Sequence, residues 1–159
     1  MKNFRLNFAR LTALIGLFGV QANLVAQTEM RWDTHGVGFT VPSDFRVSTN
    51  TTDLYTAEND HLILSISPIQ DEEISKENLA EAVLGMATAM EYESLDEASE
   101  IIINDFTGYY IKGTRDDMNA VVMALMDKAS STNLLVVIAY DNDRFEEAVA
   151  IAKSFFAYD

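Results

Sequence analysis

The sequence predicts an α+β fold: an antiparallel β-sheet of about six to seven strands with a helix packed on each face, an α/β/α sandwich. Strand-like and helix-like segments follow one another in the order β-β-β-α-β-β-β-β-α. The connections between neighbouring strands are short, which favours antiparallel pairing. Two late segments, 120–126 and 133–140, are apolar without alternation, as is typical of strands covered on both faces.

The start of the chain has the three-part order of a secretory signal peptide. Three cations and no acid precede an uncharged apolar run at 11–20, and Ala22 and Ala26 offer two cleavage points. The run is too short to cross a bilayer, which takes about 20 residues. We expect residues 1–26 to be removed, leaving 27–159 as a single α+β domain in the periplasm or outside the cell. An uncleaved anchor or a buried first helix is the alternative.

The composition excludes several kinds of site and partner. The chain has no cysteine, which rules out disulfides, thiolate ligands, cysteine nucleophiles and a lipidated N-terminal cysteine. Removing the three cations of the signal segment from 11 Lys and Arg, against 25 Asp and Glu, leaves a formal charge of −17. Nucleic acid and anionic lipid bind basic patches, so we expect no nucleic-acid partner and no stable membrane anchor. The charge suits a basic protein partner or divalent ions, although acids also keep an exported protein in solution.

The first β block follows a short tail at residues 28–36. Its opening stretch, HGVGFTVPSDFRV at 35–47, alternates apolar and small residues and then turns at a proline, and we interpret it as scaffold. The strand-like segments of the block are 37–41, 45–49 and 61–68, with a weaker one at 54–58; Leu62, Leu64 and Ile66 share one face.

The first helix is expected to begin at Ser75, whose hydroxyl suits the N-cap, with Ile74 and Leu79 at hydrophobic staple positions. A polar break at 91–100 follows this helix. Its apolar stripe at helical spacing comprises Leu79, Ala82, Val83, Met86 and Met90.

The second β block and the closing helix complete the expected order. Asp141 or Asp143 is expected to cap the helix, and Asp143 with Glu146 suits a capping box. The expected strands are 99–104, 107–114, 120–126 and 133–140, and the helix face comprises Phe145, Ala148, Val149, Ala152 and Phe155, widened by Ile151 and Phe156.

This order of segments resembles the PsbP-like superfamily, which includes extrinsic photosystem subunits, a nuclear transport factor and small bacterial exported proteins of the DcrB type. The stretch VGFTVPSDFRV, with Phe39, Pro42 and Phe45, is similar to its usual start, and FEEAVAIAKSFFAY, with Ser154 and Phe155, to its usual finish. The resemblance is one of pattern over nearly the whole mature chain. It implies a non-catalytic binding or accessory module, with no catalytic residues to carry over. Several bacterial members are lipoproteins, and this chain departs from them because it has no cysteine.

We assign no catalytic, cofactor-binding or metal-binding residue from the sequence. The strongest arrangement for a hydrolase is His61, with Ser65 and Ser67 on its face of a strand. Asp60 precedes His61, but adjacent strand residues point to opposite faces, so this carboxylate is badly placed to orient the imidazole. The chain also lacks a GxSxG nucleophile elbow.

Metal sites have equally weak support. Asp33 and His35 with the distant His61 would have to converge through the fold, and zinc needs three or four protein ligands. The acid-rich stretches 71–73, 115–119 and 141–143 lack the pattern of a calcium loop, and we interpret them as helix caps and solvated turns.

Methionine and aromatic side chains suggest a hydrophobic pocket as a further hypothesis. Flexible methionines can line an adaptable groove, although their positions on apolar patterns favour ordinary core packing over a pocket or a thioether copper site. The side chains concerned are Met86, Met90, Met118, Met123, Met126, Tyr109, Tyr110, Phe155 and Phe156.

The leading functional interpretation is an exported, non-catalytic accessory or binding protein without a cofactor. Its ligand is an unknown protein or a small apolar molecule. Three alternatives stay open: a carrier of an apolar ligand or lipid, a small hydrolase using His61, and an assembly subunit that pairs through an edge strand.

Overall fold

A computed structural model describes residues 26–70 and 74–158. The predicted signal segment lies outside the described residues except for Ala26, and it stays a prediction. In chain order the elements are β1 (Gln27–Trp32), a short 3-10 helix (Asp33–His35), β2 (Val37–Pro42), β3 (Arg46–Asn50), β4 (Tyr55–Glu58), β5 (Leu62–Pro68), α1 (Leu79–Ala89), β6 (Ser94–Leu95), β7 (Ser99–Ile103), β8 (Phe106–Arg115), β9 (Met118–Asp127), β10 (Asn133–Tyr140), α2 (Phe145–Lys153) and β11 (Phe156–Ala157).

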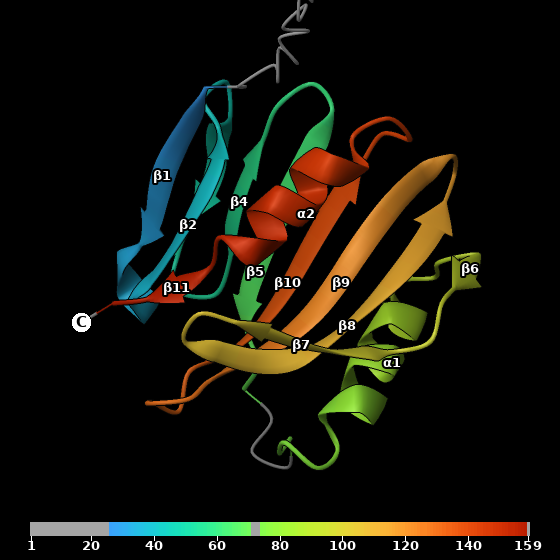
Figure 1. Cartoon of the computed structure of the whole chain (residues 1–159). Helices are drawn as coiled ribbons and strands as arrows, with labels where there is room; N and C mark the ends of the chain where they lie inside the picture. Colours follow the sequence, from blue (N-terminus) through green and yellow to red (C-terminus); the bar gives the residue numbers. More distant parts are fainter. Residues whose placement is uncertain (1–25, 71–73, 159) are drawn as a thin grey trace, which may run out of the picture.

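The fold is mostly β and is built from two antiparallel sheets (Figure 1). The larger sheet has eight strands, with the order β3-β4-β5-β10-β9-β8-β6 and with β7 also paired to β8. The smaller sheet has three strands in the order β1-β2-β11. No helix in the described part of the chain is long and apolar enough to cross a membrane.

The expectation of one sheet of six to seven strands in an α/β/α sandwich is wrong. Residues 28–36, expected as a tail, contain most of β1, which pairs with β2 to start a second sheet. The chain end adds β11 to the other side of β2, where the Phe156 ring lies over Gly38. The first β segment therefore belongs to the small sheet and not to the main one.

One face of the large sheet is covered jointly by the small sheet and α2 (Figure 1). Their aromatic side chains meet in the core: the ring centroid of Phe39 lies 5.2 Å from that of Phe155 and 5.3 Å from that of Tyr55. Trp32 is fully buried, and its Nε1 donates a hydrogen bond to the carbonyl oxygen of Thr51 at 2.8 Å. These contacts hold β1, β2 and α2 against strands β4 and β5.

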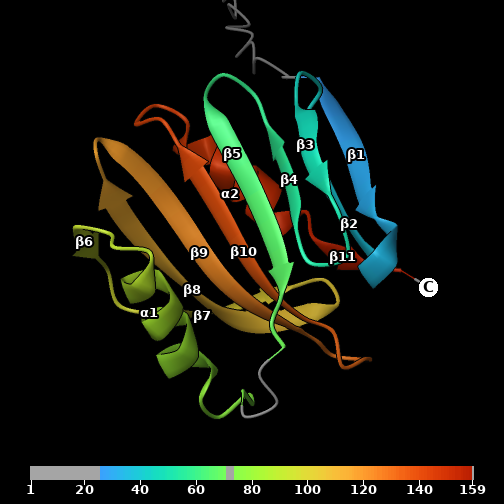
Figure 2. The same cartoon turned by 180° about the vertical axis from the view of Figure 1, so that it is seen from behind.

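The opposite face carries α1, which contacts β8 and β9 (Figure 2). Leu79, Val83 and Ala87 of the helix are buried against side chains of these two strands. The helix leaves β3, β4 and β5 uncovered on this face, where Ile63 is 40% exposed and Ser65 is half-buried. This open, partly polar face is the second reason why the sandwich expectation fails.

Strand β9 confirms the prediction that segment 120–126 is covered on both faces. Its residues from Ala120 to Leu125 are all buried. Strands alternate their side chains, so Val121 and Met123 join the core beneath α2, whereas Val122 and Ala124 face α1.

The expected helix caps are wrong in detail. Helix α1 follows Asn78 at the N-cap position, and the Asn78 Oδ1 accepts a hydrogen bond from the Ser75 backbone N–H at 2.7 Å. Ser75 is therefore the donor in this turn and not the cap. Helix α2 follows Arg144 and has no side-chain cap from Asp141 or Asp143, nor a capping box with Glu146.

Substitution of Gly108, with Gly85 as a control, tests the packing of β8 on β9. Gly108 lies so close to β9 that an added Cβ would stand 2.0 Å from the carbonyl oxygen of Ala124. We expect Gly108→Ala to lower the free energy of unfolding by about 1–3 kcal/mol, the usual cost of overpacking. Urea denaturation followed by circular dichroism measures this change.

Gly85 supplies the matched control, because a Cβ there meets open space on α1. Gly85→Ala should raise the free energy of unfolding by roughly 0.5–1 kcal/mol through helix propensity. Equal stability of the Gly108→Ala protein and the wild type would contradict the described β8–β9 packing.

The end of the chain gives a prediction about pH. The Tyr158 hydroxyl donates a hydrogen bond to Asp33 Oδ1, and the Tyr158 backbone N–H donates to the Gly36 carbonyl at 2.8 Å. Partial desolvation, this hydrogen bond and the Asp33 charge together raise the pKa of Tyr158 from 10.0 to about 12. The stabilising contribution of the neutral phenol is therefore complete below pH 10 and is lost as the pH rises towards 12.

We expect Asp33→Asn to lower the pKa of Tyr158, because it removes a negative charge next to the phenolate. Absorbance titration of tyrosinate, taken as the difference from the Tyr158→Phe protein, measures this pKa. An unchanged titration curve in Asp33→Asn would show that this contact is absent in solution.

Candidate functional site

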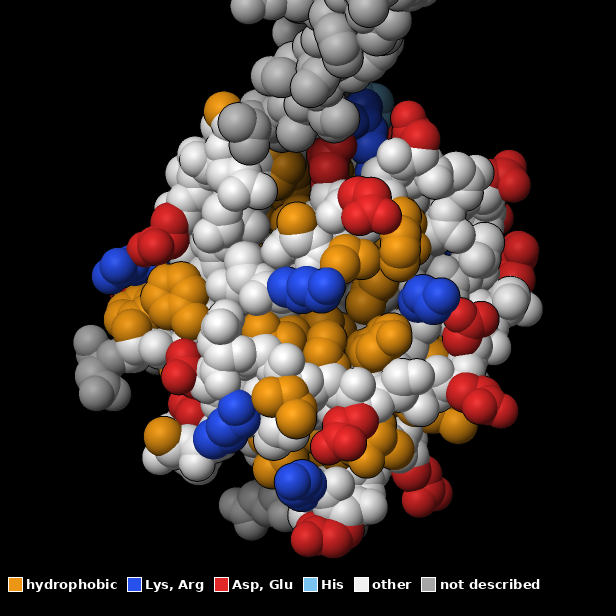
Figure 3. Space-filling model, viewed as in Figure 1, with side chains coloured by type: hydrophobic (Ala, Val, Ile, Leu, Met, Phe, Trp, Pro, Cys, Tyr) orange, Lys and Arg blue, Asp and Glu red, His pale blue; other side chains and the backbone are white. Residues whose placement is uncertain are grey.

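The cover of the large sheet ends at α2 and leaves a groove over β7, β8 and β9, with a volume of about 470 Å³. Figure 3 shows this face with an apolar area at its centre and basic side chains beside it. We call this hollow the α2 groove. Its lining residues are Ile101, Tyr110, Lys112, Val121, Met123, Phe145, Glu146, Val149, Ala152 and Lys153.

The floor of the α2 groove follows from strand alternation. Tyr110 and Lys112 on β8 pair directly with Met123 and Val121 on β9, so all four side chains lie on one face. Ile101 on β7 extends the floor beyond β8. The intervening residues point to α1, so the floor is supported from behind by a packed layer.

The wall of the groove is the side of α2 that is turned away from the small sheet. Phe145 was expected in the buried helix face, but it is 41% exposed and its ring centroid lies 6.0 Å from that of Tyr140. Val149 is half-buried and lines the groove, whereas Ala148 and Ile151 are buried in the core. The helix therefore divides its apolar residues between the core and the groove.

The two ends of the groove differ in charge. At the Phe145 end, the Lys112 Nζ lies 3.2 Å from Asp96 Oδ2 and 5.9 Å from the Phe145 ring centroid, and Glu146 adds a further carboxylate. At the other end, Lys153 has no ion pair with any described residue. The hydroxyl of Tyr110, which is half-buried on the floor, makes no hydrogen bond to a residue in the described ranges.

A polar hollow of about 420 Å³ adjoins the Phe145 end of the groove and shares Lys112 and Phe145 with it. Tyr140 and Asp96 also line this hollow. Burial raises the pKa of Tyr140, and the Lys112 charge acts in the opposite direction. The adjoining hollow therefore places a protonated phenol next to a Lys–Asp pair at the end of the groove.

The predicted pocket residues are only partly brought together. Met123 and Tyr110 line the α2 groove. Tyr109, Met126 and Met90 pack on the opposite side of the sheet with α1, and Phe155 is wholly buried in the core. Sequence reasoning missed Val149 as a groove residue, and it missed Lys112 and Lys153 because spacing along the chain does not show their position.

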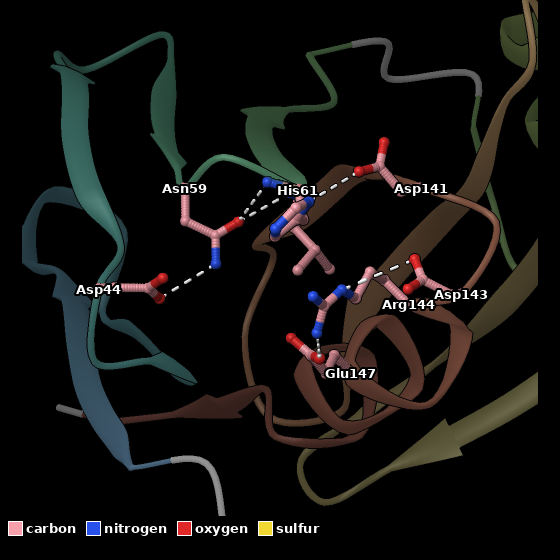
Figure 4. Close-up of polar contacts among 8 residues, drawn as sticks. Asp44, Asn59, His61, Asp141, Asp143, Arg144 and Glu147 are labelled. Atoms are coloured by element: carbon pink, nitrogen blue, oxygen red, sulfur yellow. Dashed lines mark hydrogen bonds and ion pairs between the residues drawn. The ribbon is translucent and has the colours of Figure 1, made fainter.

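The structure places the hydrolase candidates differently from the sequence interpretation. Asp60 lies 3.5 Å from the Arg46 guanidinium, whereas His61 Nδ1 contacts Asp141 Oδ2 at 2.8 Å (Figure 4). Both side chains of the His61–Asp141 pair are about half exposed, at 47% and 46%. Within residues 26–70 and 74–158, no Ser or Thr hydroxyl hydrogen-bonds this imidazole.

The neighbours of His61 hold turns in place (Figure 4). Asn59 Oδ1 accepts hydrogen bonds from the backbone N–H groups of His61 and Leu62, at 3.0 and 2.8 Å. Arg144 donates to Glu147 at 2.7 Å, and this hydrogen bond and the Glu147 charge raise the pKa of Arg144. These contacts account for the polar cluster as a structural feature at one end of the sheet.

The histidines do not form a shared metal site. The ring of His35 lies 4.1 Å from that of Trp32, and its Nε2 contacts the Thr52 carbonyl oxygen at 2.6 Å. Among the described residues, no group of three His, Cys, Asp or Glu side chains is placed to hold a metal ion. The acidic stretch 71–73 lies outside the described residues.

No protein-family model and no curated protein sequence matches the chain. Several solved structures match its fold, two of which are the following. A protein of Bacteroides thetaiotaomicron, 10% identical, has a TM-score of 0.52 over 84% of this chain and 48% of its own, so this chain spans about half of it. The Ran-binding protein Mog1p of Saccharomyces cerevisiae, 9% identical, has a TM-score of 0.58 over 85% of this chain and 97% of its own. At these identities the two structures show a shared fold alone, and the resemblance to the PsbP-like superfamily stays a prediction.

Proposed function

We propose that this chain is an exported, non-catalytic binding protein and that its ligand occupies the α2 groove. The observation that carries the proposal is a groove of about 470 Å³ with an apolar floor and a few polar groups at its ends. Ligand sites in proteins are typically concave, mostly apolar and about 300–1,000 Å³ in volume. The groove therefore has the size and chemistry of a small-molecule site.

The proposed location rests on the first residues of the chain. Their order of cations, apolar run and small residues is that of a secretory signal, which directs a protein to the periplasm or the medium.

A protein partner is the second candidate, favoured by one observation on the structure. Strands β3, β4 and β5 have a face without helix cover, and Ile63 is partly exposed there. Mog1p, which shares the fold, is described as a Ran-binding protein. The formal charge, −14 for the whole chain and −17 without the predicted signal segment, suits a basic partner, whose binding would weaken as the salt concentration rises.

The hydrolase alternative gains an orienting carboxylate in Asp141, but in residues 26–70 and 74–158 no Ser or Thr hydroxyl hydrogen-bonds His61. We expect His61→Ala to leave ligand binding at the α2 groove unchanged and to lower the free energy of unfolding by less than about 1 kcal/mol, as is usual for an exposed pair. Urea denaturation and a screen with chromogenic esters measure the two effects. An esterase activity that His61→Ala abolishes would contradict the proposal and support an enzyme.

A charge placed in the groove wall tests the proposed site. Val149→Glu puts a carboxylate beside the apolar floor, where it loses hydration on ligand binding. We expect this variant to bind the neutral apolar dye Nile red on the order of tenfold more weakly than the wild type, which corresponds to ~1.4 kcal/mol. Dye fluorescence during titration with protein measures the affinity.

Ala150→Glu is the matched control, because Ala150 is exposed, lies next to Val149 on α2 and does not line the groove. Its dye affinity should stay within about twofold of the wild type, a change of under ~0.5 kcal/mol. Equal dye binding by both variants and the wild type would place the ligand elsewhere.

A further inference from the structure

We propose that the ligand of the α2 groove is a free alkyl carboxylate, with its head group at Lys153 and Tyr110 and its chain along the floor towards Phe145. This inference rests on the proposed function, because it names the ligand of the same groove. The proposed ligand is a single amphiphile dissolved in water and not a lipid within a membrane surface.

The sign of the charge at Lys153 is the first argument. The mature chain has about three acids for each cation, so most positive charges meet an acid nearby. Arg31, Arg46, Lys112, Arg115 and Arg144 all have an ion-pair partner among the described residues. Lys76, Lys128 and Lys153 have no ion pair with a described residue, and of these three only Lys153 lines the groove, where its ammonium is available to a carboxylate ligand.

The hydroxyl of Tyr110 is the second argument, independent of the first. It lies on the half-buried floor and has no hydrogen-bond partner in the described part of the chain. The oxygen is not among the buried unsatisfied atoms of the described residues, so it is open to solvent and free to donate to a ligand that enters the groove. Tyr110 lies on the floor two residues along β8 from Lys112, on the side towards Lys153, so a ligand carboxylate that pairs with Lys153 would be within reach of the Tyr110 hydroxyl as a hydrogen-bond donor.

The opposite end of the groove sets the direction of the ligand. Lys112 is paired with Asp96, and Glu146 adds a negative charge at the start of α2, so this end disfavours an anion. The apolar side chains of Val121, Met123 and Val149 lie between the two ends. An amphiphile would therefore place its chain over these residues and its head at Lys153.

The length of the wall indicates the length of the ligand. Phe145 and Lys153 are eight positions apart on α2, which at the α-helical rise corresponds to ~12 Å, about the length of an extended ten-carbon chain. A medium-chain carboxylate such as decanoate is therefore the probe of choice, and 1-decanol is its neutral match.

Displacement of Nile red by decanoate and by 1-decanol tests the inference. We expect the wild type to bind decanoate up to about fivefold more tightly than 1-decanol, as one exposed ion pair allows, and Lys153→Met to remove most of this difference while leaving 1-decanol binding unchanged. Lys153→Arg should restore the preference because it keeps the charge. Tyr110→Phe should weaken decanoate binding about two- to fivefold, close to the usual net contribution of one solvent-accessible hydrogen bond.

Lys76→Met is the control for the loss of one positive charge, because Lys76 is exposed in the turn before α1, on the other side of the sheet. It should leave the binding of both probes unchanged. Higher salt should weaken decanoate binding and spare 1-decanol, since an exposed ion pair is screened.

The outcomes separate this inference from the proposed function. Equal binding of both probes, unaffected by Lys153→Met, would overturn the carboxylate ligand and leave the apolar groove standing. Binding of neither probe, together with no binding of Nile red, would overturn both. Binding to phosphatidylglycerol vesicles without binding of dissolved decanoate would show a membrane partner and would also overturn the inference.

Discussion

The burial of β9 on both faces is the constraint on which the rest of the structure depends. Six consecutive residues, Ala120 to Leu125, are buried, and their side chains alternate between two separate cores. An apolar strand of this kind is stable only with cover on both sides. Helix α1 provides the cover behind, and Val122 and Ala124 pack against it. The floor of the α2 groove is therefore the front of a strand that is held in place from the back.

The groove exists because the small sheet and α2 cover only part of one face of the large sheet. The small sheet lies over β4 and β5, and the nine-residue helix α2 follows it across β10. Ser154, at the end of α2, accepts a hydrogen bond from the Thr40 backbone N–H at 2.8 Å, which ties the helix to β2. Because α2 is held on that side, it does not extend over β7 and β8. Ile101, Tyr110 and Met123 are left at the edge of the core, open to a ligand.

The sequence predicted elements whose pattern is local and missed those that depend on distant partners. The alternation in β5 and the apolar run in β9 are visible without a structure, and both strands are confirmed. Strand β1 buries only Trp32 among its six residues, so its sequence shows no alternation of apolar and polar residues that would predict a strand. The small sheet also needs Phe156 of β11, which is distant in the sequence. The residues of the α2 groove also divide into those that a local pattern predicts and those that depend on distant partners. Met123 and Tyr110 were singled out by residue type, whereas the importance of Lys153 depends on which acids are absent around it in space.

The apolar floor and Lys153 are expected to make different contributions to ligand binding. Burying a methylene group contributes about 0.8 kcal/mol, so a ten-carbon chain would contribute up to ~8 kcal/mol on full burial. Lost translational and rotational freedom costs ~4 kcal/mol or more, and an exposed ion pair returns only about 0–1 kcal/mol. The apolar floor of Val121 and Met123 would therefore supply most of the affinity. Lys153 would instead supply selectivity and direction, because it distinguishes a carboxylate from a neutral head group at one end of an otherwise undirected apolar surface.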